Sequence, residues 1–260
     1  MNIVANNHLE GVNSKALAKA RRKEGRLFFN LSLPSLITIL IVVFIPVFWL
    51  SSLSFFDRAG DFSWENYDRI FQSQLYIKTF IVTLKISFIT LFFCILLGYP
   101  LCYWLSQLPD RLAGILMVFV LLPFWTSILV RTYAWLVILQ RNGIINDTLI
   151  SIGWIDEPLQ LAHNLTGSII GMVHILLPFF ILPLFASMRS IDTNFIRAAI
   201  SLGSTPRGAF WRVFFKMSLP GFFAGTVLVF VLALGTYVTP ALLGGGKIQM
   251  LAQRIDSTIM

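Results

Sequence analysis

The sequence predicts an all-α, polytopic membrane protein, and three observations support that prediction. Apolar residues make up 57% of the 260 residues and charged residues only 12%, about half of the ~25% that is usual in soluble domains. The mean hydropathy is +0.78. The apolar residues gather into runs without charge, each close to the roughly 20 residues that a helix needs to cross a bilayer. A water-soluble globular domain, a collagen-like chain, a disordered chain and a disulfide scaffold are thereby excluded.

Five runs are long enough to cross once, because a charge at mid-bilayer costs roughly 2.5 to 3.5 kcal/mol. They cover residues 27–56, about 79–103, a third run that starts at Leu112, a fourth within 166–188, and a fifth from about 219 to 243. Lys85 lies near enough to the start of the second run to extend its ammonium group to the headgroups. The first 26 residues lack the apolar core of a cleavable signal peptide, so the first helix is expected to direct insertion.

Lys and Arg are distributed unequally among the polar segments. Six lie in the tail of residues 1–26 and five in residues 189–216, whereas residues 57–78 and 141–157 hold more acidic than basic groups. Because cytoplasmic loops carry the excess of Lys and Arg, the tail and the 189–216 loop are expected inside the cell. This distribution explains the net charge of +8 without a nucleic-acid partner, and the basic inner face is also expected to attract anionic membrane lipid.

The second basic segment is predicted to fold as helix, turn, helix. Asp192 can cap a helix, and Gly203 can end it in the left-handed conformation. Ser204 or Thr205 can cap a second helix that has Pro206 in its first turn, where a missing N–H costs nothing. The small residues around this elbow suit close docking against another protein, and a solvated connecting loop is the alternative.

The elbow resembles the ATPase-docking motif of binding-protein-dependent ABC importer permeases, which reads Glu-Ala-Ala, three residues, Gly, and an aromatic residue seven further on. The docking-loop residues here are Arg197, Ala198, Ala199, Gly203, Ser204 and Phe210. Arg197 replaces the family's Glu, and Lys216 replaces the Pro that follows the Gly by thirteen residues. The resemblance implies contact with an ATPase subunit, and the reversed charge at Arg197 implies an altered strength of docking.

Other runs resemble the permeases of spermidine/putrescine importers. They are residues 64–67 (Trp-Glu-Asn-Tyr), 122–127 (Leu-Pro-Phe-Trp-Thr-Ser), 131–135 (Arg-Thr-Tyr-Ala-Trp), 141–143 (Arg-Asn-Gly) and 237–245 (Tyr-Val-Thr-Pro-Ala-Leu-Leu-Gly-Gly). The resemblance implies a type I ABC importer permease bundle, with five transmembrane helices present and a sixth expected beyond residue 260. It implies a cytoplasmic basic tail (1–26), a transmembrane permease domain (27–246) with its docking loop (189–216), and a periplasmic end of a truncated chain (247–260).

The implied function is import of polyamines by a permease subunit that is not itself an enzyme. The implied partners are a second permease, two subunits that bind ATP and Mg, and a periplasmic or lipid-anchored solute-binding protein. The implied location is the bacterial inner membrane, crossed several times, with a cytoplasmic N-terminus. Two alternatives stay open: an ABC permease for ferric iron, sulfate or an amino-acid-like solute, and a membrane scaffold that transports nothing.

The residues themselves offer no catalytic, metal or ATP site, so no cofactor is expected in this chain. His8, His163 and His174 are scattered, without a carboxylate or Cys at ligand spacing. The sequence around Gly246-Lys247 lacks the first Gly and the Ser or Thr of a phosphate loop. His174 lies within a span, where it is expected to make a helix-packing hydrogen bond or to contact the solute.

Aromatic residues near one charged residue are the candidates for the translocation path. All twelve acidic residues lie outside the predicted spans, so aromatic faces would hold a cation, at roughly 0.5 to 2 kcal/mol each. The path candidates are Trp125, Arg131, Tyr133, Trp135 and Tyr237. The alternative is an interfacial belt of aromatic residues, with Arg131 either extended to the outer headgroups or buried, where it would repel a polycation.

Overall fold

The computed structural model describes residues 29–56, 60–246 and 248–259, which form helices and no named strand. The all-α prediction is confirmed. The chain divides into two compact units, the first ending at Ser73 and the second beginning at Gln74. The predicted basic tail of residues 1–26 lies outside the described residues.

The first unit contains one long apolar helix and one short polar helix. The apolar helix runs from Phe29 to Leu53, with a π-helical turn η1 (Leu40–Phe44) followed by α2 (Ile45–Leu53). It matches the first predicted span, and its apolar side chains are exposed, as lipid contact requires. The polar helix is α3 (Glu65–Gln72).

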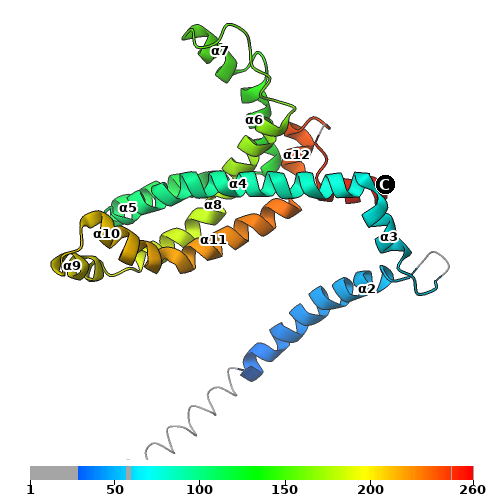
Figure 1. The fold of residues 1–260 in the computed structure, drawn as a ribbon, viewed down its shortest axis with the longest axis horizontal. Coiled ribbons are helices and arrows are strands. Elements are labelled where there is room, and N and C mark those ends of the chain that lie inside the picture. The colour runs from blue at the N-terminus through cyan, green and yellow to red at the C-terminus, as the bar shows by residue number, and fades with distance from the viewer. Residues whose placement is uncertain (1–28, 57–59, 247, 260) are drawn as a thin grey trace, which may run out of the picture. The chain divides into compact units, whose positions relative to one another are not determined.

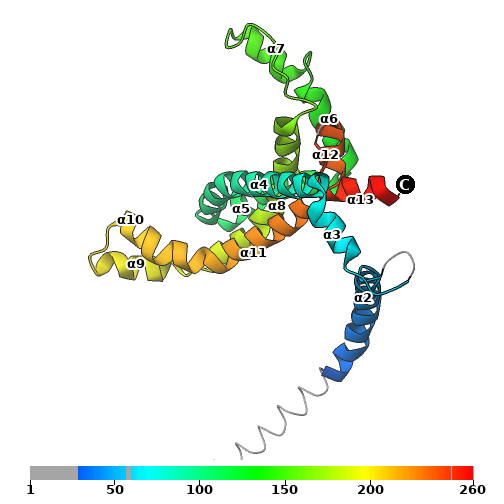
Figure 2. The ribbon, with the colours of Figure 1, turned by 45° about the vertical axis from the view of Figure 1, so that its right-hand side comes forward.

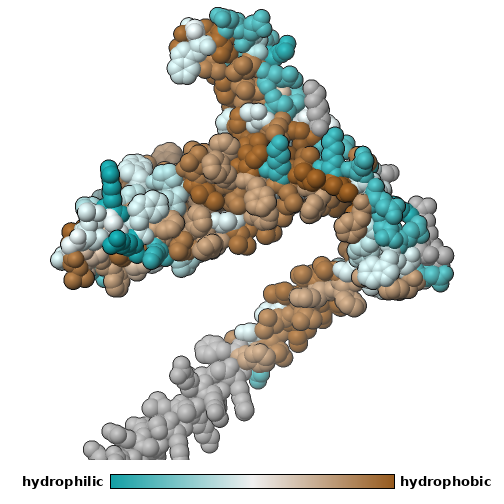
Figure 3. Space-filling view, viewed as in Figure 1, coloured by the Kyte–Doolittle hydropathy of each residue, from teal (hydrophilic) through white to brown (hydrophobic). Residues whose placement is uncertain are grey.

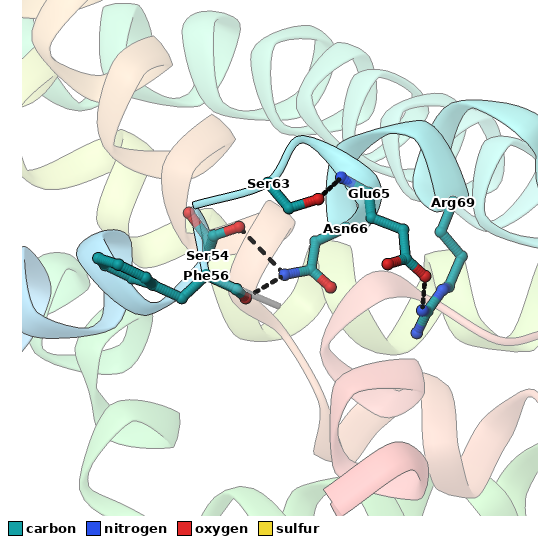
Figure 4. A network of polar contacts seen from close by, with 6 residues as sticks. All are labelled: Ser54, Phe56, Ser63, Glu65, Asn66 and Arg69. Carbon is teal, nitrogen blue, oxygen red and sulfur yellow. Dashed lines mark hydrogen bonds and ion pairs between the residues drawn. The ribbon is translucent and has the colours of Figure 1, made fainter. Parts of the chain in front are cut away.

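A network of polar contacts closes the corner between these two helices (Figure 4). The Asn66 Nδ2 group donates to the carbonyl oxygens of Ser54 and Phe56, at 3.2 and 2.9 Å. Glu65 forms an ion pair with Arg69 one helical turn later, at 2.9 Å. The Trp-Glu-Asn-Tyr run at residues 64–67 therefore has a structural role, because its Asn66 side chain satisfies backbone carbonyl groups that the end of the first span leaves free.

Three long helices form the core of the second unit and lie side by side (Figures 1 and 2). They are α4 (Gln74–Ser106), α8 (Leu165–Arg189) and α11 (Phe215–Gly235). The most apolar window of α8 is 50% buried, so α8 is the central helix of the three. The free thiols of Cys94 and Cys102 lie 3.9 and 3.6 Å from the α8 carbonyl oxygens of Val173 and Ile181, as expected of small buried residues.

Glycines allow these helices to approach closely. A Cβ atom at Gly98 of α4 would lie 2.5 Å from the Phe180 ring of α8. A Cβ at Gly225 of α11 would lie 2.9 Å from the carbonyl oxygen of Phe180, and one at Gly221 would lie 2.6 Å from that of Pro183. Gly221 and Gly225 thus form a ridge of small residues that lets the backbones of α8 and α11 come into contact.

The third predicted run is not one continuous helix. It consists of α5 (Asp110–Leu121), a 3-10 turn η2 (Leu122–Trp125) and α6 (Ile128–Leu139), followed by α7 (Ile144–Ser151). The two halves meet at an angle of 95°. Thr126 and Ser127 are extended, with ψ of 150° and 139°, and Pro123 has no N–H to donate, so the helical ladder is interrupted there.

The fifth predicted run ends earlier than expected. α11 stops at Gly235, Thr236 is extended with ψ of 124°, and a separate helix α12 (Val238–Leu243) packs against α6 and α8 (Figure 2). A hydroxyl contact of 3.4 Å joins Thr239 of α12 to Thr132 of α6. A final helix, α13 (Leu251–Ile259), lies against α4 and α11.

The surface of the second unit is broadly apolar along its helices (Figure 3). Phe88, Phe92 and Leu96 of α4 recur at every fourth residue and are 57%, 59% and 52% exposed, which is a stripe suited to lipid. Four helices of the described chain have the length and composition to cross a membrane, or five when the bent pair counts as one span. The prediction of a multi-pass membrane protein is confirmed.

Candidate functional site

The predicted helix-turn-helix elbow is confirmed at one end of the second unit, where α9 (Thr193–Ser201) and α10 (Pro206–Ala209) meet (Figure 1). The Asp192 side chain caps α9 by accepting from the Asn194 N–H at 2.8 Å. Thr205 caps α10 by accepting from the Gly208 N–H at 3.2 Å. The second of the two proposed caps, Thr205, is thus the one used, with Pro206 in the first turn.

Gly203 sets the turn between the two helices. Its φ is +89°, a left-handed conformation that a side chain other than Gly rarely adopts. Its N–H donates to the Ile200 carbonyl at 2.9 Å, and the Ser204 N–H donates to the Ala199 carbonyl at 3.0 Å. These two bonds are a Schellman motif, which explains physically why the sequence pattern has Ala199, Gly203 and Ser204 at these positions.

The docking-loop residues differ in exposure. The exposed residues are Arg197, Ala198 and Gly203. The half-buried residues are Ala199, Ser204 and Phe210. The elbow also presents large apolar side chains, of which Leu202 is 89% and Trp211 61% exposed. The sequence analysis did not single out Trp211 as a docking residue, because exposure cannot be read from an aromatic residue inside a charge-poor segment. Exposed apolar groups beside small residues form a surface suited to a protein partner.

Aromatic stacking anchors the base of the elbow to α4. A π-helical turn η3 (Phe210–Phe214) continues α10 into α11. The rings of Phe210 and Phe214 lie 5.1 and 5.2 Å from the Tyr103 ring, both edge-on. A displacement of the elbow therefore acts directly on the end of α4.

Arg189 ties the last turn of α8 to the turn between α4 and α5. Its guanidinium donates to the carbonyl oxygens of Ser106 and Leu108, at 2.9 and 2.8 Å, and forms an ion pair with Asp110. A side-chain exposure of 29% leaves it partly shielded from water. The docking loop thus begins at a residue that is fixed to two other helices.

We expect Arg189→Ala to lower the thermal stability of the detergent-solubilised protein. The change removes two charge-assisted hydrogen bonds from a partly buried site, a loss of about 1 to 3 kcal/mol. Arg69→Ala is the matched control. The Arg69 and Glu65 side chains of that ion pair are 52% and 61% exposed, so the pair contributes about 0 to 1 kcal/mol. Equal melting temperatures for the two variants would contradict this role of Arg189.

Two of the path candidates, Arg131 and Trp135, lie one turn apart on α6. Trp135 of α6 packs edge-on against His174 of α8, with ring centroids 5.5 Å apart, and both line an apolar pocket of about 520 Å³ between α4, α6 and α8. Arg131, one turn earlier on α6, has Nε and Nη1 buried without a hydrogen-bond partner among the described residues. The buried Nδ1 of His174 likewise has none there, so the expected packing hydrogen bond is not found at that atom.

The other path candidates lie on exposed surfaces. Trp125, at the bend between α5 and α6, is 86% exposed, and Tyr133 on α6 is 55% exposed. Tyr237 lies between α11 and α12 and is 41% exposed. These three aromatic faces remain accessible in the isolated chain.

Tyr237 is paired with a carboxylate that the sequence analysis missed. Its hydroxyl donates to Asp256 Oδ2 of α13 at 2.9 Å. The hydrogen bond to Asp256 and the carboxylate charge raise the pKa of the Tyr237 phenol, so the phenol remains a neutral donor. No local signal predicts this pair, because 19 residues separate the two partners.

The described residues contain no group of three or more His, Cys, Asp or Glu side chains placed to hold a metal ion. The histidines of the described chain, His163 and His174, lie apart: His163 follows α7, near Gly245, and His174 lies inside α8. The candidate site features of this part of the chain are the exposed elbow, the aromatic faces and isolated charges.

The relatives found by comparison with known proteins include permease proteins of transport systems. No protein-family model matches the chain. The spermidine/putrescine transport system permease protein PotB of Salmonella typhimurium (strain SL1344) is 32% identical over 215 residues, 80% of this chain and 75% of that protein. PotB of Haemophilus influenzae is 33% identical over 228 residues, 85% of this chain and 79% of that protein. Among solved structures, a bacterial ABC transporter involved in the import of the acidic polysaccharide alginate has a TM-score of 0.67 at 19% identity, covering 94% of this chain and 87% of that one.

The long apolar helices, together with a fold like that of a solved ABC transporter chain, define a polytopic membrane protein. The PotB relatives are permease proteins of a transport system, so this chain is a transport subunit and not an enzyme. The curated relatives are more than 30% identical and are covered over more than two thirds of their length. The chain belongs to the family of spermidine/putrescine transport system permease proteins, PotB.

Proposed function

We propose that this chain carries polyamines, spermidine and putrescine, across the bacterial inner membrane as one permease of an ATP-driven importer. The observation that carries the proposal is the identity of 32% to 33% with PotB proteins over 75% to 79% of their length. The partners are a second permease, two ATP-binding subunits and a periplasmic or lipid-anchored solute-binding protein. ATP and Mg bind to the ATPase subunits.

In this proposal, residues 189–216 face the cytoplasm and dock the ATPase. The exposed Ala198 and Leu202 and the Schellman turn at Gly203 support that assignment. The N-terminal tail of residues 1–26 is then cytoplasmic, residues 27–246 form the transmembrane domain, and residues 247–260 lie on the periplasmic side. Anionic lipid contacts the basic inner face.

ATP-driven closure of the two ATPases draws the elbows of the two permeases together and tilts the helices as rigid bodies. The contacts of Tyr103 with Phe210 and Phe214, and of Arg189 with the turn before α5, give that motion a route into α4. The path candidates Trp125, Arg131, Tyr133, Trp135 and Tyr237 line the route or its mouth. The exposed faces of Trp125, Tyr133 and Tyr237 support this role, because a path formed between two permeases needs accessible groups.

The test is uptake of radiolabelled spermidine and putrescine by cells without their own polyamine importers that express the full-length gene with its neighbouring subunits. We expect uptake of both amines, competed by unlabelled polyamine and not by ferric iron, sulfate or amino acids. A well-inserted, fully assembled complex that takes up a competing solute and neither amine would refute the substrate. Uptake of no solute would favour the scaffold alternative.

A further inference from the structure

Asp256 is an acidic residue whose charge is not neutralised by any cation of the described chain. It lies on α13, and its one hydrogen bond there is the 2.9 Å bond from the Tyr237 hydroxyl. No Lys, Arg or His of the described residues lies within ion-pair distance of it. One phenol uses one of about four acceptor positions of a carboxylate, so the remaining oxygen positions are open to another donor.

The helix that carries Asp256 is held in place by specific contacts. The first N–H of α13, on Leu251, donates to Thr83 Oγ1 of α4 at 2.8 Å. The Gln253 side chain accepts from the Met250 N–H at 3.0 Å, the reach-back contact of a capping box. Its amide also lies 3.5 Å from the Tyr237 carbonyl oxygen. The start of α13 is therefore fixed to α4 through the Thr83 side chain, and to the backbone of Tyr237 through the Gln253 side chain.

The nearby cation on α13 is directed elsewhere. The Arg254 guanidinium carbon lies 5.9 Å from the centroid of the Tyr76 ring of α4, and its Nε is buried. Residues two apart on a helix point to different faces, so Arg254 does not neutralise Asp256. The Tyr237 ring, 41% exposed, thus lies beside a carboxylate that forms no ion pair with any described residue.

The site lies at the end of α11 opposite the docking elbow, since α11 continues from α10 at one end and reaches Tyr237 at the other (Figures 1 and 2). All acidic residues lie outside the predicted spans, so the predicted aromatic path contains no negative charge of its own. The Asp256 carboxylate places a negative charge at this end of α11, beside the path candidate Tyr237. An aromatic face combined with a carboxylate suits an organic ammonium group, which uses cation–π attraction and charged hydrogen bonds together.

We propose that the Asp256 carboxylate and the Tyr237 ring form a binding site for a primary ammonium group at the outer mouth of this permease. The inference rests on the proposed polyamine transport, and it assigns to the transport path a carboxylate that binds the cation. The Asp256 oxygens accept N–H bonds from the ammonium group, the Tyr237 ring covers its charge, and the Tyr237 hydroxyl holds the carboxylate in position. The attraction to a partly exposed site is weak enough to release the solute inward.

The first test is the concentration dependence of spermidine uptake by the full complex. Asp256→Asn keeps the shape and removes the charge, and we expect the KM to rise about three- to tenfold with little change in the maximal rate per transporter. Asp256→Glu restores the charge and is expected to recover most of the lost affinity. Asp156→Asn, in the exposed segment after α7, makes the same change of charge and is expected to leave the KM unchanged. Membrane abundance of each variant is measured by immunoblot.

The second test does not depend on transport. A water-soluble carbodiimide joins a bound primary ammonium group to the carboxylate that it pairs with. One carboxylate oxygen leaves with the carbodiimide as a urea, and the ammonium nitrogen gives up two protons, both of which end on the urea nitrogens, as the amide bond forms. Peptide mass spectrometry of the purified complex treated with spermidine and carbodiimide then locates the amide. We expect the spermidine adduct on Asp256 in clear excess over Asp156.

The outcomes separate this inference from the proposed function. If the complex takes up no spermidine but gains the adduct at Asp256, the proposed transport of spermidine is refuted and the ammonium site is supported. A complex that transports spermidine, shows the same KM with Asp256→Asn as with Asp156→Asn, and gains equal adducts at both positions overturns the site.

Discussion

Gly203→Val is expected to reduce ATP-driven uptake about tenfold or more while leaving the protein in the membrane. Gly203 has a φ of +89°, and a β-branched residue in that region costs about 1 to 3 kcal/mol, where each 1.4 kcal/mol is about a factor of ten. The strained turn would relax by breaking the Schellman bonds from Gly203 and Ser204. The elbow would then no longer present its exposed residues to the ATPase in one geometry.

The matched control for this variant is Gly153→Val. Gly153 has a φ of +77° and, like Gly203, nothing within 4 Å of an added Cβ, so the substitution meets similar backbone strain in a loop on another part of the second unit. Uptake and copurification of the ATPase subunits are measured for both. An equal loss of uptake in the two variants, or unchanged uptake with Gly203→Val, would contradict a specific role of the elbow.

Gly221→Leu is expected to cause a large loss of stability in the second unit. A Cβ atom at this position would lie 2.6 Å from the Pro183 carbonyl oxygen and would overlap the Ser187 side chain. Because one of the obstructing atoms belongs to the α8 backbone, α8 and α11 must separate to admit the new side chain. Overpacking of this kind costs about 1 to 3 kcal/mol, at times more. Thermal unfolding of the solubilised protein and its abundance in the membrane report the effect.

Gly235→Leu tests whether that loss arises from packing. Gly235 lies at the other end of the same helix, and an added Cβ there meets nothing within 4 Å. This variant adds the same side chain to α11 and is expected to unfold within a few degrees of the parent. A similar destabilisation by both variants would show that the close approach of α8 and α11 at Gly221 is not what limits stability.

The elbow was predictable because its signals are local. Asp192, Gly203 and Pro206 act through hydrogen bonds and dihedral angles within a few residues of each other, and the structure uses each as the sequence analysis expected. The positions of the spans were predictable for a similar reason, since absence of charge over about 20 residues is a property of the segment alone.

The bend in the third span and the end of the fifth were not predictable in the same way. Pro123 is compatible with a kinked helix or a broken one, and the choice of a 95° turn depends on packing of α6 against α8 and α12. The fifth run continues without charge past Gly235, so composition cannot mark the extended residue at Thr236.

The Tyr237–Asp256 pair depends on contacts far apart in the sequence. The chain between the two residues turns through Gly245 and Gly246, with φ of +58° and +73°, and α13 is then fixed by Thr83 of α4. A Gly-rich run indicates that a turn occurs but not which groups it brings together. The carboxylate beside the path aromatic could therefore be found only from the structure.

The most direct test of the proposed function is uptake of radiolabelled spermidine into proteoliposomes that hold the full-length chain with the second permease, the ATPase subunits and the solute-binding protein. The proposed function predicts uptake that requires ATP on the side of the 189–216 loop and the binding protein on the other side, and that is lost with Gly203→Val. Spermidine uptake that proceeds without the ATPase subunits would contradict it, as would an ATPase-active complex that moves no polyamine.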